Sequence, residues 1–160
     1  MRLKITLQTD VIKAIPINYQ YFLSSTIYNL LATSNLDFAT ALHDGKHLKS
    51  PKKFKWFTFS WFQIPASQRV ISNSIMKILP GQFNWFITSP WKKFIQYLVN
   101  GLLELCEIRI EKEKFQIVQV ETLPDVILSK AKNLYCQKFI CLSPLVVTTK
   151  KEHKGKLTKY

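Results

Sequence analysis

The spacing of apolar residues changes repeatedly over the first 121 positions, and this succession restricts the chain to few folds. Residues 3–8 alternate apolar with polar side chains, which is typical of a strand with one buried face. Residues 19–33 then carry apolar side chains three and four positions apart, which predicts an amphipathic helix. The apolar stripe of this helix comprises Leu23, Ile27, Leu30 and Leu31.

A second, shorter helix is expected directly after the first. Ser34 and Asn35 break the first helix, and side chains of this kind can cap the helix that follows. Gly45 is a helix stop signal because glycine readily adopts the left-handed conformation. The short helix therefore ends near Gly45, and His43 lies in its last turn.

Three β segments are expected next. Residues 54–62 carry aromatic side chains on both faces, which indicates a central strand covered on both sides or a strand whose exposed face binds a flat ligand. Residues 70–79 and 82–88 are two further segments. Pro80 and Gly81 between them suit the middle of a type II turn, so a hairpin is predicted.

A third helix should follow the hairpin. Ser89 reads as its N-cap and Pro90 as its first residue, and the apolar stripe ends near Leu105. Residues 115–121 form the next predicted strand, and residues 136–149 hold one or two more.

The resulting order is β, α in two pieces, β, β, α, β, with one extra strand before the hairpin turn. This is the ferredoxin-like arrangement βαββαβ, an α+β fold. We expect an N-terminal ferredoxin-like domain over residues 1–123. Residues 124–160 would form a linker, the first strands of an incomplete second ferredoxin-like domain and a lysine-rich tail.

The charge of the chain indicates a polyanionic partner. Lys and Arg total 23 and Asp and Glu total 10, giving a net charge of +13. Such an excess favours nucleic acid or an anionic membrane surface.

The residues form no signal-peptide pattern and no apolar stretch of about 18 residues that could span a membrane. Cys106, Cys136 and Cys141 are odd in number and lack metal-site spacing, so we expect reduced thiols and a cytoplasmic protein.

Five strings, in this order along the chain, resemble one family. They are residues 15–21 (IPINYQY) with 27–29 (IYN), 42–43 (LH), 53–60 (KFKWFTFS), 98–104 (LVNGLLE) and 139–149 (FICLSPLVVTT). Together they resemble the CRISPR-associated endoribonucleases that mature guide RNA, the sixth numbered Cas family of the RAMP superfamily. The resemblance covers about residues 2–149 and favours RNA, rather than a membrane, as the partner.

The resemblance implies two tandem ferredoxin-like halves and cleavage within CRISPR repeat RNA without a metal ion or other cofactor. It places a catalytic tyrosine at Tyr28, a histidine at His43 and a lysine at Lys55. Each residue type alone is more often structural or solvated. Family members also continue into a second half with a glycine-rich loop, which this sequence lacks. A non-catalytic RNA-binding relative or an inactive fragment therefore stays open as the alternative.

The three residues suit metal-free cleavage, in which the RNA 2′-hydroxyl attacks its own phosphodiester. The reaction needs a base, an acid for the leaving 5′-oxygen and positive charge near the phosphorane, and it yields a 2′,3′-cyclic phosphate and a 5′-hydroxyl. Histidine suits proton transfer near neutral pH, although its role as base or acid is open. Tyr28 can orient, donate a hydrogen bond or protonate the leaving group, and Lys55 can stabilise the phosphorane.

Basic residues next to aromatic rings are the RNA-binding candidates, because cations bind phosphates and rings stack on bases. They are Lys46, Lys49, Lys52 and Lys53 beside Trp56, and Lys92 and Lys93 beside Trp91. The alternative is that the rings belong to the core and the lysines are merely solvated.

His47 lies four residues after His43, but Gly45 should end the helix first, so no metal pair is predicted. A homodimer and hand-over of the cut RNA to a CRISPR effector complex are further possibilities.

Overall fold

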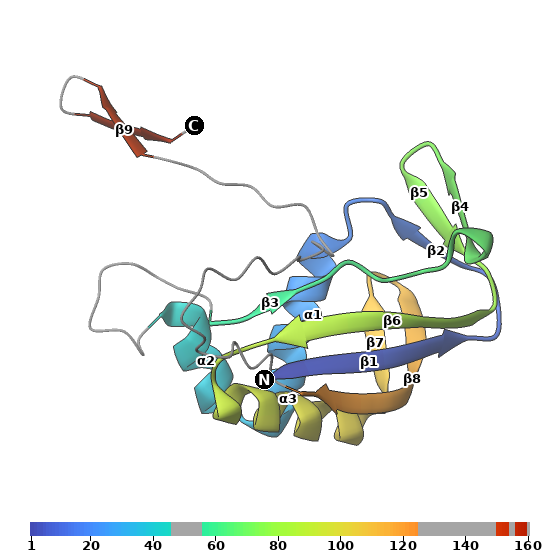
Figure 1. The fold of residues 1–160 in the computed structure, drawn as a ribbon, viewed down its shortest axis with the longest axis horizontal. Helices are drawn as coiled ribbons and strands as arrows, with labels where there is room; N and C mark the ends of the chain where they lie inside the picture. Colours follow the sequence, from blue (N-terminus) through green and yellow to red (C-terminus); the bar gives the residue numbers. More distant parts are fainter. Residues whose placement is uncertain (46–55, 125–149, 154–155, 160) are drawn as a thin grey trace, which may run out of the picture. The chain divides into compact units, whose positions relative to one another are not determined.

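The computed structural model describes residues 1–45, 56–124, 150–153 and 156–159. The chain divides into two compact units, residues 1–130 and 131–160, which are described separately below. Figure 1 shows the larger unit as a mixed α and β domain with antiparallel strands. The predicted α+β, ferredoxin-like class is confirmed.

A five-stranded antiparallel sheet with the strand order β3-β6-β1-β8-β7 forms the centre of the larger unit. Its strands are β3 (Thr58–Phe59), β6 (Gly81–Thr88), β1 (Arg2–Thr9), β8 (Glu113–Leu123) and β7 (Glu107–Ile110). Strand β1 pairs with β6 from Arg2↔Thr88 to Thr9↔Gly81 and with β8 on its other side. The first strand of the chain is thus central, as the split arrangement of this fold requires.

Alternation along β1 separates the two faces of the sheet. Leu3, Ile5 and Leu7 are fully buried in the core, together with inward residues of β6 and of the helices. The opposite face is polar: Lys4 forms an ion pair with Glu121 at 2.8 Å. The period-two pattern of the sequence therefore identifies correctly the apolar side chains of β1 that enter the core.

Three helices supply a large part of the core: α1 (Gln20–Ser34), α2 (Leu36–Asp44) and α3 (Lys92–Leu105). Helices α1 and α3 pack especially closely at Gly101. A Cβ atom at this position would lie 2.0 Å from the backbone oxygen of Leu30, so only glycine fits the observed spacing.

The predicted signals at both ends of α2 are confirmed. The Asn35 side chain accepts a hydrogen bond from the Phe38 N–H at 2.8 Å, which caps the amino end. Gly45 has φ 71° and closes the carboxyl end in the left-handed conformation. His43 consequently lies in the last turn, as expected.

The hairpin predicted across Pro80 and Gly81 is wrong. Residues 70–79 do not form one strand but two, β4 (Arg69–Ser72) and β5 (Ile75–Ile78), which turn at Asn73 with φ 55°. Strand β5 pairs with β4 on one side and with β2 (Lys13–Pro16) on the other. Since both edges of β5 are occupied, β6 joins the central sheet instead.

Two further expectations need correction. Within residues 56–62, the described part of the aromatic segment, the one strand is β3, an edge strand paired with β6, and Phe62 beyond it stacks on Tyr19 with ring centroids 5.2 Å apart. Helix α3 begins at Lys92 rather than at Pro90. The Ser89 side chain accepts a hydrogen bond from the Trp91 N–H at 3.0 Å, and Trp91 keeps an extended backbone.

The smaller unit contains an antiparallel pair, β9 (Lys150–His153) and β10 (Lys156–Lys159), in the segment predicted as a lysine-rich tail. The strands expected over residues 136–149 lie outside the described residues. The interpretation of residues 124–160 as the start of a second ferredoxin-like domain stays a prediction. Within the described part of the chain, no helix is long and apolar enough to cross a membrane.

Candidate active site

Tyr28 of α1 and His43 of α2 lie against each other. The two helices are separated by Asn35 alone and pack together, which brings residues from the middle of α1 next to the last turn of α2. The ring centroids are 5.4 Å apart and the rings meet edge to face at 75°. This geometry is a favourable aromatic contact, so the fold brings together two residues of the predicted catalytic set.

Tyr28 occupies the buried side of this pair. The residue is half-buried, and its hydroxyl oxygen is shielded from solvent. Burial raises the pKa of Tyr28 above its ordinary value near 10, because the charged phenolate is poorly solvated there. The hydroxyl is therefore neutral at physiological pH, and it can donate a hydrogen bond but cannot act as a standing base.

His43 occupies the open side. Its side chain is 73% exposed, so the imidazole is accessible from solvent. Its Nδ1 atom lies 3.7 Å from Oδ1 of Asp44, which is too long for a hydrogen bond but close enough for attraction when the imidazole is protonated. The pair thus combines one exposed proton carrier with one buried, neutral hydroxyl.

A third ring, Phe57, contacts Tyr28 from the segment that leads into β3. The centroids of Tyr28 and Phe57 are 5.8 Å apart at 77°. Phe57 also stacks on Phe94 of α3, with centroids 5.0 Å apart at 17°. Phe57 was not among the predicted site residues. Its aromatic string was noticed in the sequence, but no local pattern indicates which of its rings faces Tyr28.

Trp56 and Trp91 stack on each other beside this site, with centroids 5.7 Å apart at 22°. Ser89 holds both segments, because its hydroxyl donates to the Trp56 carbonyl at 2.6 Å and accepts from the Trp91 N–H. Trp91 also contacts Phe38 of α2 at 5.9 Å. Both indoles are half-buried, so each combines packing with some remaining exposed surface.

Lys92 and Lys93 are exposed at the first two positions of α3. The amino end of a helix carries partial positive charge, and α3 has no acidic residue in its first turn to offset it. Two lysines at this point therefore create a positive region next to Trp91. The other predicted cations, Lys46, Lys49, Lys52, Lys53 and Lys55, lie outside the described residues.

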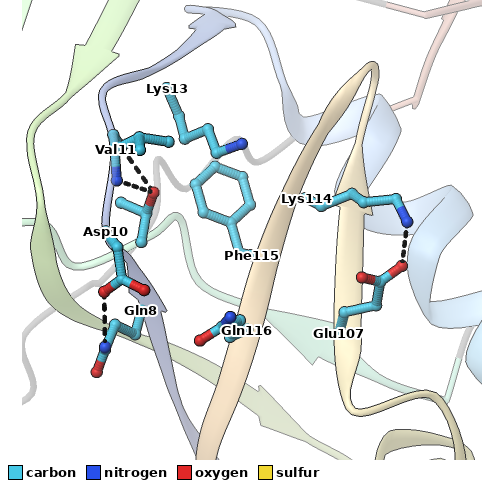
Figure 2. A pocket seen from close by; sticks show the side chains of 9 residues that line it. Gln8, Asp10, Val11, Lys13, Glu107, Lys114, Phe115 and Gln116 are labelled. Atoms are coloured by element: carbon cyan, nitrogen blue, oxygen red, sulfur yellow. Dashed lines mark hydrogen bonds and ion pairs between the residues drawn. The ribbon is translucent and has the colours of Figure 1, made fainter.

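A separate cavity of about 340 Å³ opens where β1 ends and approaches β7 and β8 (Figure 2). Its charged groups have partners: Lys114 binds Glu107 at 2.8 Å, Lys13 binds Glu113 at 3.2 Å, and Asp10 accepts a hydrogen bond from Gln8 at 2.9 Å. Tyr28 and His43 do not line it. Figure 2 shows the Phe115 ring at its centre, and this ring is fully buried. Each charged side chain that lines the cavity therefore already has a partner.

Comparison with known proteins identifies the family. The sequence profile described as CRISPR-associated protein Cas6, N-terminal, matches residues 14–121, about two thirds of the chain. This chain belongs to the Cas6 family. The matched region includes Tyr28, His43, Phe57 and the amino end of α3, so the resemblance first seen in short strings is confirmed.

Two Cas6 relatives illustrate the extent of the similarity. CRISPR-associated endoribonuclease Cas6 1 of Methanocaldococcus jannaschii is 38% identical over 124 residues, which cover 78% of this chain and 46% of the relative. CRISPR-associated endoribonuclease Cas6 of Pyrococcus furiosus is 32% identical over 142 residues, covering 88% and 49%. The chain spans about half the length of these curated relatives.

Solved Cas6 structures support the same assignment. A CRISPR-associated Cas6 protein that is 34% identical superposes with a TM-score of 0.67, covering all of this chain and 61% of that protein. A Cas6-related protein from Pyrococcus furiosus, 26% identical, gives a TM-score of 0.71 and 60% coverage of its own length. The Cas6 fold therefore extends over the described strands and helices, and it places the Tyr28–His43 pair within a shared architecture.

Proposed function

We propose that this Cas6-family chain takes part in endonucleolytic cleavage of CRISPR repeat RNA, with His43 as the residue that transfers protons. The observation that carries the proposal is the edge-to-face contact of Tyr28 with the exposed His43, inside the region matched by the family profile. Two relatives named as CRISPR-associated endoribonucleases support the reaction class.

The proposed reaction uses only groups of the RNA and the protein. The 2′-hydroxyl of one nucleotide attacks the adjacent phosphorus, its proton passes to a base, and the bond to the leaving 5′-oxygen breaks as that oxygen gains a proton. The products are a 2′,3′-cyclic phosphate and a 5′-hydroxyl. A histidine that has accepted the first proton can return one in the second step.

The two described site residues suit different parts of this reaction. His43 is exposed and can reach the scissile phosphodiester. Tyr28 is neutral and its hydroxyl oxygen is shielded, so we assign it the orientation of His43 rather than direct proton transfer. Lys55 remains the candidate cation for the phosphorane, where a positive charge would stabilise the transition state.

RNA binding is assigned to the basic and aromatic residues around this pair. Lys92 and Lys93 sit at the positive end of α3, where a backbone phosphate would be attracted by charge and by the helix dipole. The partly exposed Trp56 and Trp91 can offer ring surface to a base. The lysines of residues 46–55 would extend the positive region. Homodimer formation and hand-over of the product to a CRISPR effector complex stay predictions, and light scattering tests the first.

The decisive experiment is cleavage of an end-labelled CRISPR repeat RNA in excess EDTA. Wild type should cut the RNA and leave a 2′,3′-cyclic phosphate. His43→Ala should reduce the rate by about a hundredfold or more, as expected for loss of a general acid or base. Thr40→Ala, an exposed change on the same helix, is the matched control and should cleave normally. A single 2′-deoxy nucleotide at the cut site should block cleavage.

Other results would point elsewhere. Cleavage of the 2′-deoxy substrate would contradict attack by the 2′-hydroxyl, and loss of activity in EDTA would contradict a metal-independent reaction. If wild type binds the repeat on a gel but never cuts it, the chain acts as an RNA-binding relative without catalysis.

A further inference from the structure

Three rings form a continuous series from the core to the exposed imidazole. Phe94 of α3 is fully buried. Phe57 stacks on it at 5.0 Å, Tyr28 meets Phe57 edge to face at 5.8 Å, and His43 meets Tyr28 edge to face at 5.4 Å. The series links the consecutive helices α1 and α2 with the segment before β3 and with α3, which lie further along the chain.

The exposed imidazole of His43 needs a contact that restricts its orientation. His43 lies in the last turn of a helix of nine residues, and its side chain is 73% exposed. Solvent does not restrict the rotation of an imidazole, whereas contact with a neighbouring ring does. Tyr28 restricts the imidazole only while its own ring is held in place. Phe57, which stacks face to face on Phe94, provides the fixed surface that Tyr28 contacts.

We propose that Phe57 is a positioning residue that fixes Tyr28 and, through Tyr28, holds His43 in the orientation required for RNA cleavage. This inference rests on the proposed function for its catalytic consequence. The packing itself can be tested without RNA. Phe57 has no titratable group and acts only through the position of its neighbours.

Phe22 provides the matched control. It is a half-buried phenylalanine of α1 that packs against the same core, and its described ring contact is with Tyr21 at 6.0 Å. Phe22→Ala therefore removes a comparable side chain from the same domain without touching the ring series. A general loss of packing would affect both variants alike, whereas a positioning role affects only Phe57→Ala.

The experiment compares wild type, Phe57→Ala, Phe57→Leu and Phe22→Ala by two readouts. The first is the NMR signals of the His43 imidazole protons in the free protein, which sense the neighbouring Tyr28 ring. The second is the rate of single-turnover cleavage of repeat RNA, measured together with the Kd of each protein for that RNA. For Phe57→Ala we expect displaced His43 signals and a cleavage rate lower by about tenfold to a hundredfold, since small misplacements have effects of that size. The Kd should change less than about threefold, and Phe22→Ala should resemble wild type in both readouts.

Unchanged His43 signals and an unchanged cleavage rate in folded Phe57→Ala would overturn the proposal, as would equal effects of Phe22→Ala. If Phe57→Ala does not fold, Phe57→Leu decides, because leucine keeps apolar volume but lacks the ring that Tyr28 contacts; wild-type behaviour of this variant would also overturn it. If wild type itself does not cleave RNA, the proposed function fails, and the His43 signals alone still decide whether Phe57 positions the pair.

Discussion

Burial affects two tyrosines of the larger unit in different surroundings. The ring of Tyr28 contacts the exposed His43, and its hydroxyl oxygen is shielded from solvent. Tyr19, at the start of α1, is only 2% exposed, and its hydroxyl oxygen accepts a hydrogen bond from the Phe62 N–H at 3.0 Å. This bond anchors the irregular chain after β3. Tyr19 is thus a structural residue, although its residue type alone does not distinguish it from a catalytic one.

The pKa of Tyr19 leads to a prediction about stability at alkaline pH. Burial raises this pKa to about 12, whereas the pKa of a tyrosine in an unfolded chain is about 10. The neutral form is therefore favoured by the folded state. The stability that it contributes is complete below pH 10 and is lost as the pH rises from 10 to about 12. Across this window, wild type should lose about 2–3 kcal/mol more unfolding free energy than Tyr19→Phe.

Urea unfolding of both proteins at several pH values measures this difference. Below pH 9, Tyr19→Phe should be less stable than wild type by about 1–3 kcal/mol, because the buried Phe62 N–H loses its acceptor. The gap should then narrow with rising pH. Parallel stability curves for the two proteins would show that Tyr19 ionises equally easily in the folded and unfolded states.

Local sequence pattern predicted the position of His43 in the fold correctly. His43 could be placed in a helical last turn because both helix signals, at Asn35 and Gly45, act through bonds within the same segment. Tyr28 and His43 were predicted to share a site, and the structure brings their rings into contact. Phe57 was missed because its role depends on Phe94, 37 positions further along the chain. Lys55 lies outside the described residues and stays a prediction.

At the scale of elements, the approach of α1 to α3 depends on one glycine. Gly101→Ala should destabilise the domain by about 1–3 kcal/mol, because the new methyl group would overlap the Leu30 carbonyl and force the helices apart. This outcome opposes intrinsic helix propensity, which favours alanine over glycine by about 1 kcal/mol. Thermal or urea unfolding measures whether Gly101→Ala lowers or raises the stability of the domain.

The control is Asn100→Ala, an exposed neighbour on α3, which should change stability by less than about 0.5 kcal/mol. A more stable Gly101→Ala variant would mean that the helices are less closely packed than described.

Sequence patterns predicted best the helices and strands whose own apolar periodicity indicates which face packs against the core. Helices α1 and α2 and strands β1 and β8 carry long apolar patterns and lie close to their expected positions. Strands β2 and β7 are only four residues long, too short for a pattern to appear. The hairpin of β4 and β5 was misread because the choice between pairing with β6 and pairing with β2 depends on distant parts of the chain.

At the scale of the whole molecule, the charge of +13 predicts RNA binding that weakens steeply with salt. If Lys92 and Lys93 contact phosphates, the double change Lys92→Ala and Lys93→Ala should make the slope of log Kd against log salt shallower by about 1–2, since each phosphate contact contributes about one unit. Filter binding or fluorescence anisotropy at several salt concentrations measures the slope.

The matched control for this experiment removes the same charge elsewhere. Lys77 on β5 and Lys112 in the turn between β7 and β8 are exposed and lie outside the region around α3 where RNA is expected. Lys77→Ala with Lys112→Ala should leave the slope near its wild-type value. Equal losses in both double variants would indicate that RNA responds to the net charge alone, without a defined phosphate contact at α3.

The single-residue junction between α1 and α2 has a consequence for the order in which the site assembles during folding. Tyr28 and His43 are 15 positions apart, so their contact closes a short loop and can form as soon as the two helices dock. The contacts of Phe57 with Tyr28 and of Phe94 with Phe57 span 29 and 37 positions, so we expect them to form later, when β3 pairs with the sheet and α3 packs against α1. We therefore expect the exposed pair to form early and locally, and the rings that hold it in place to pack with the slower, long-range part of folding.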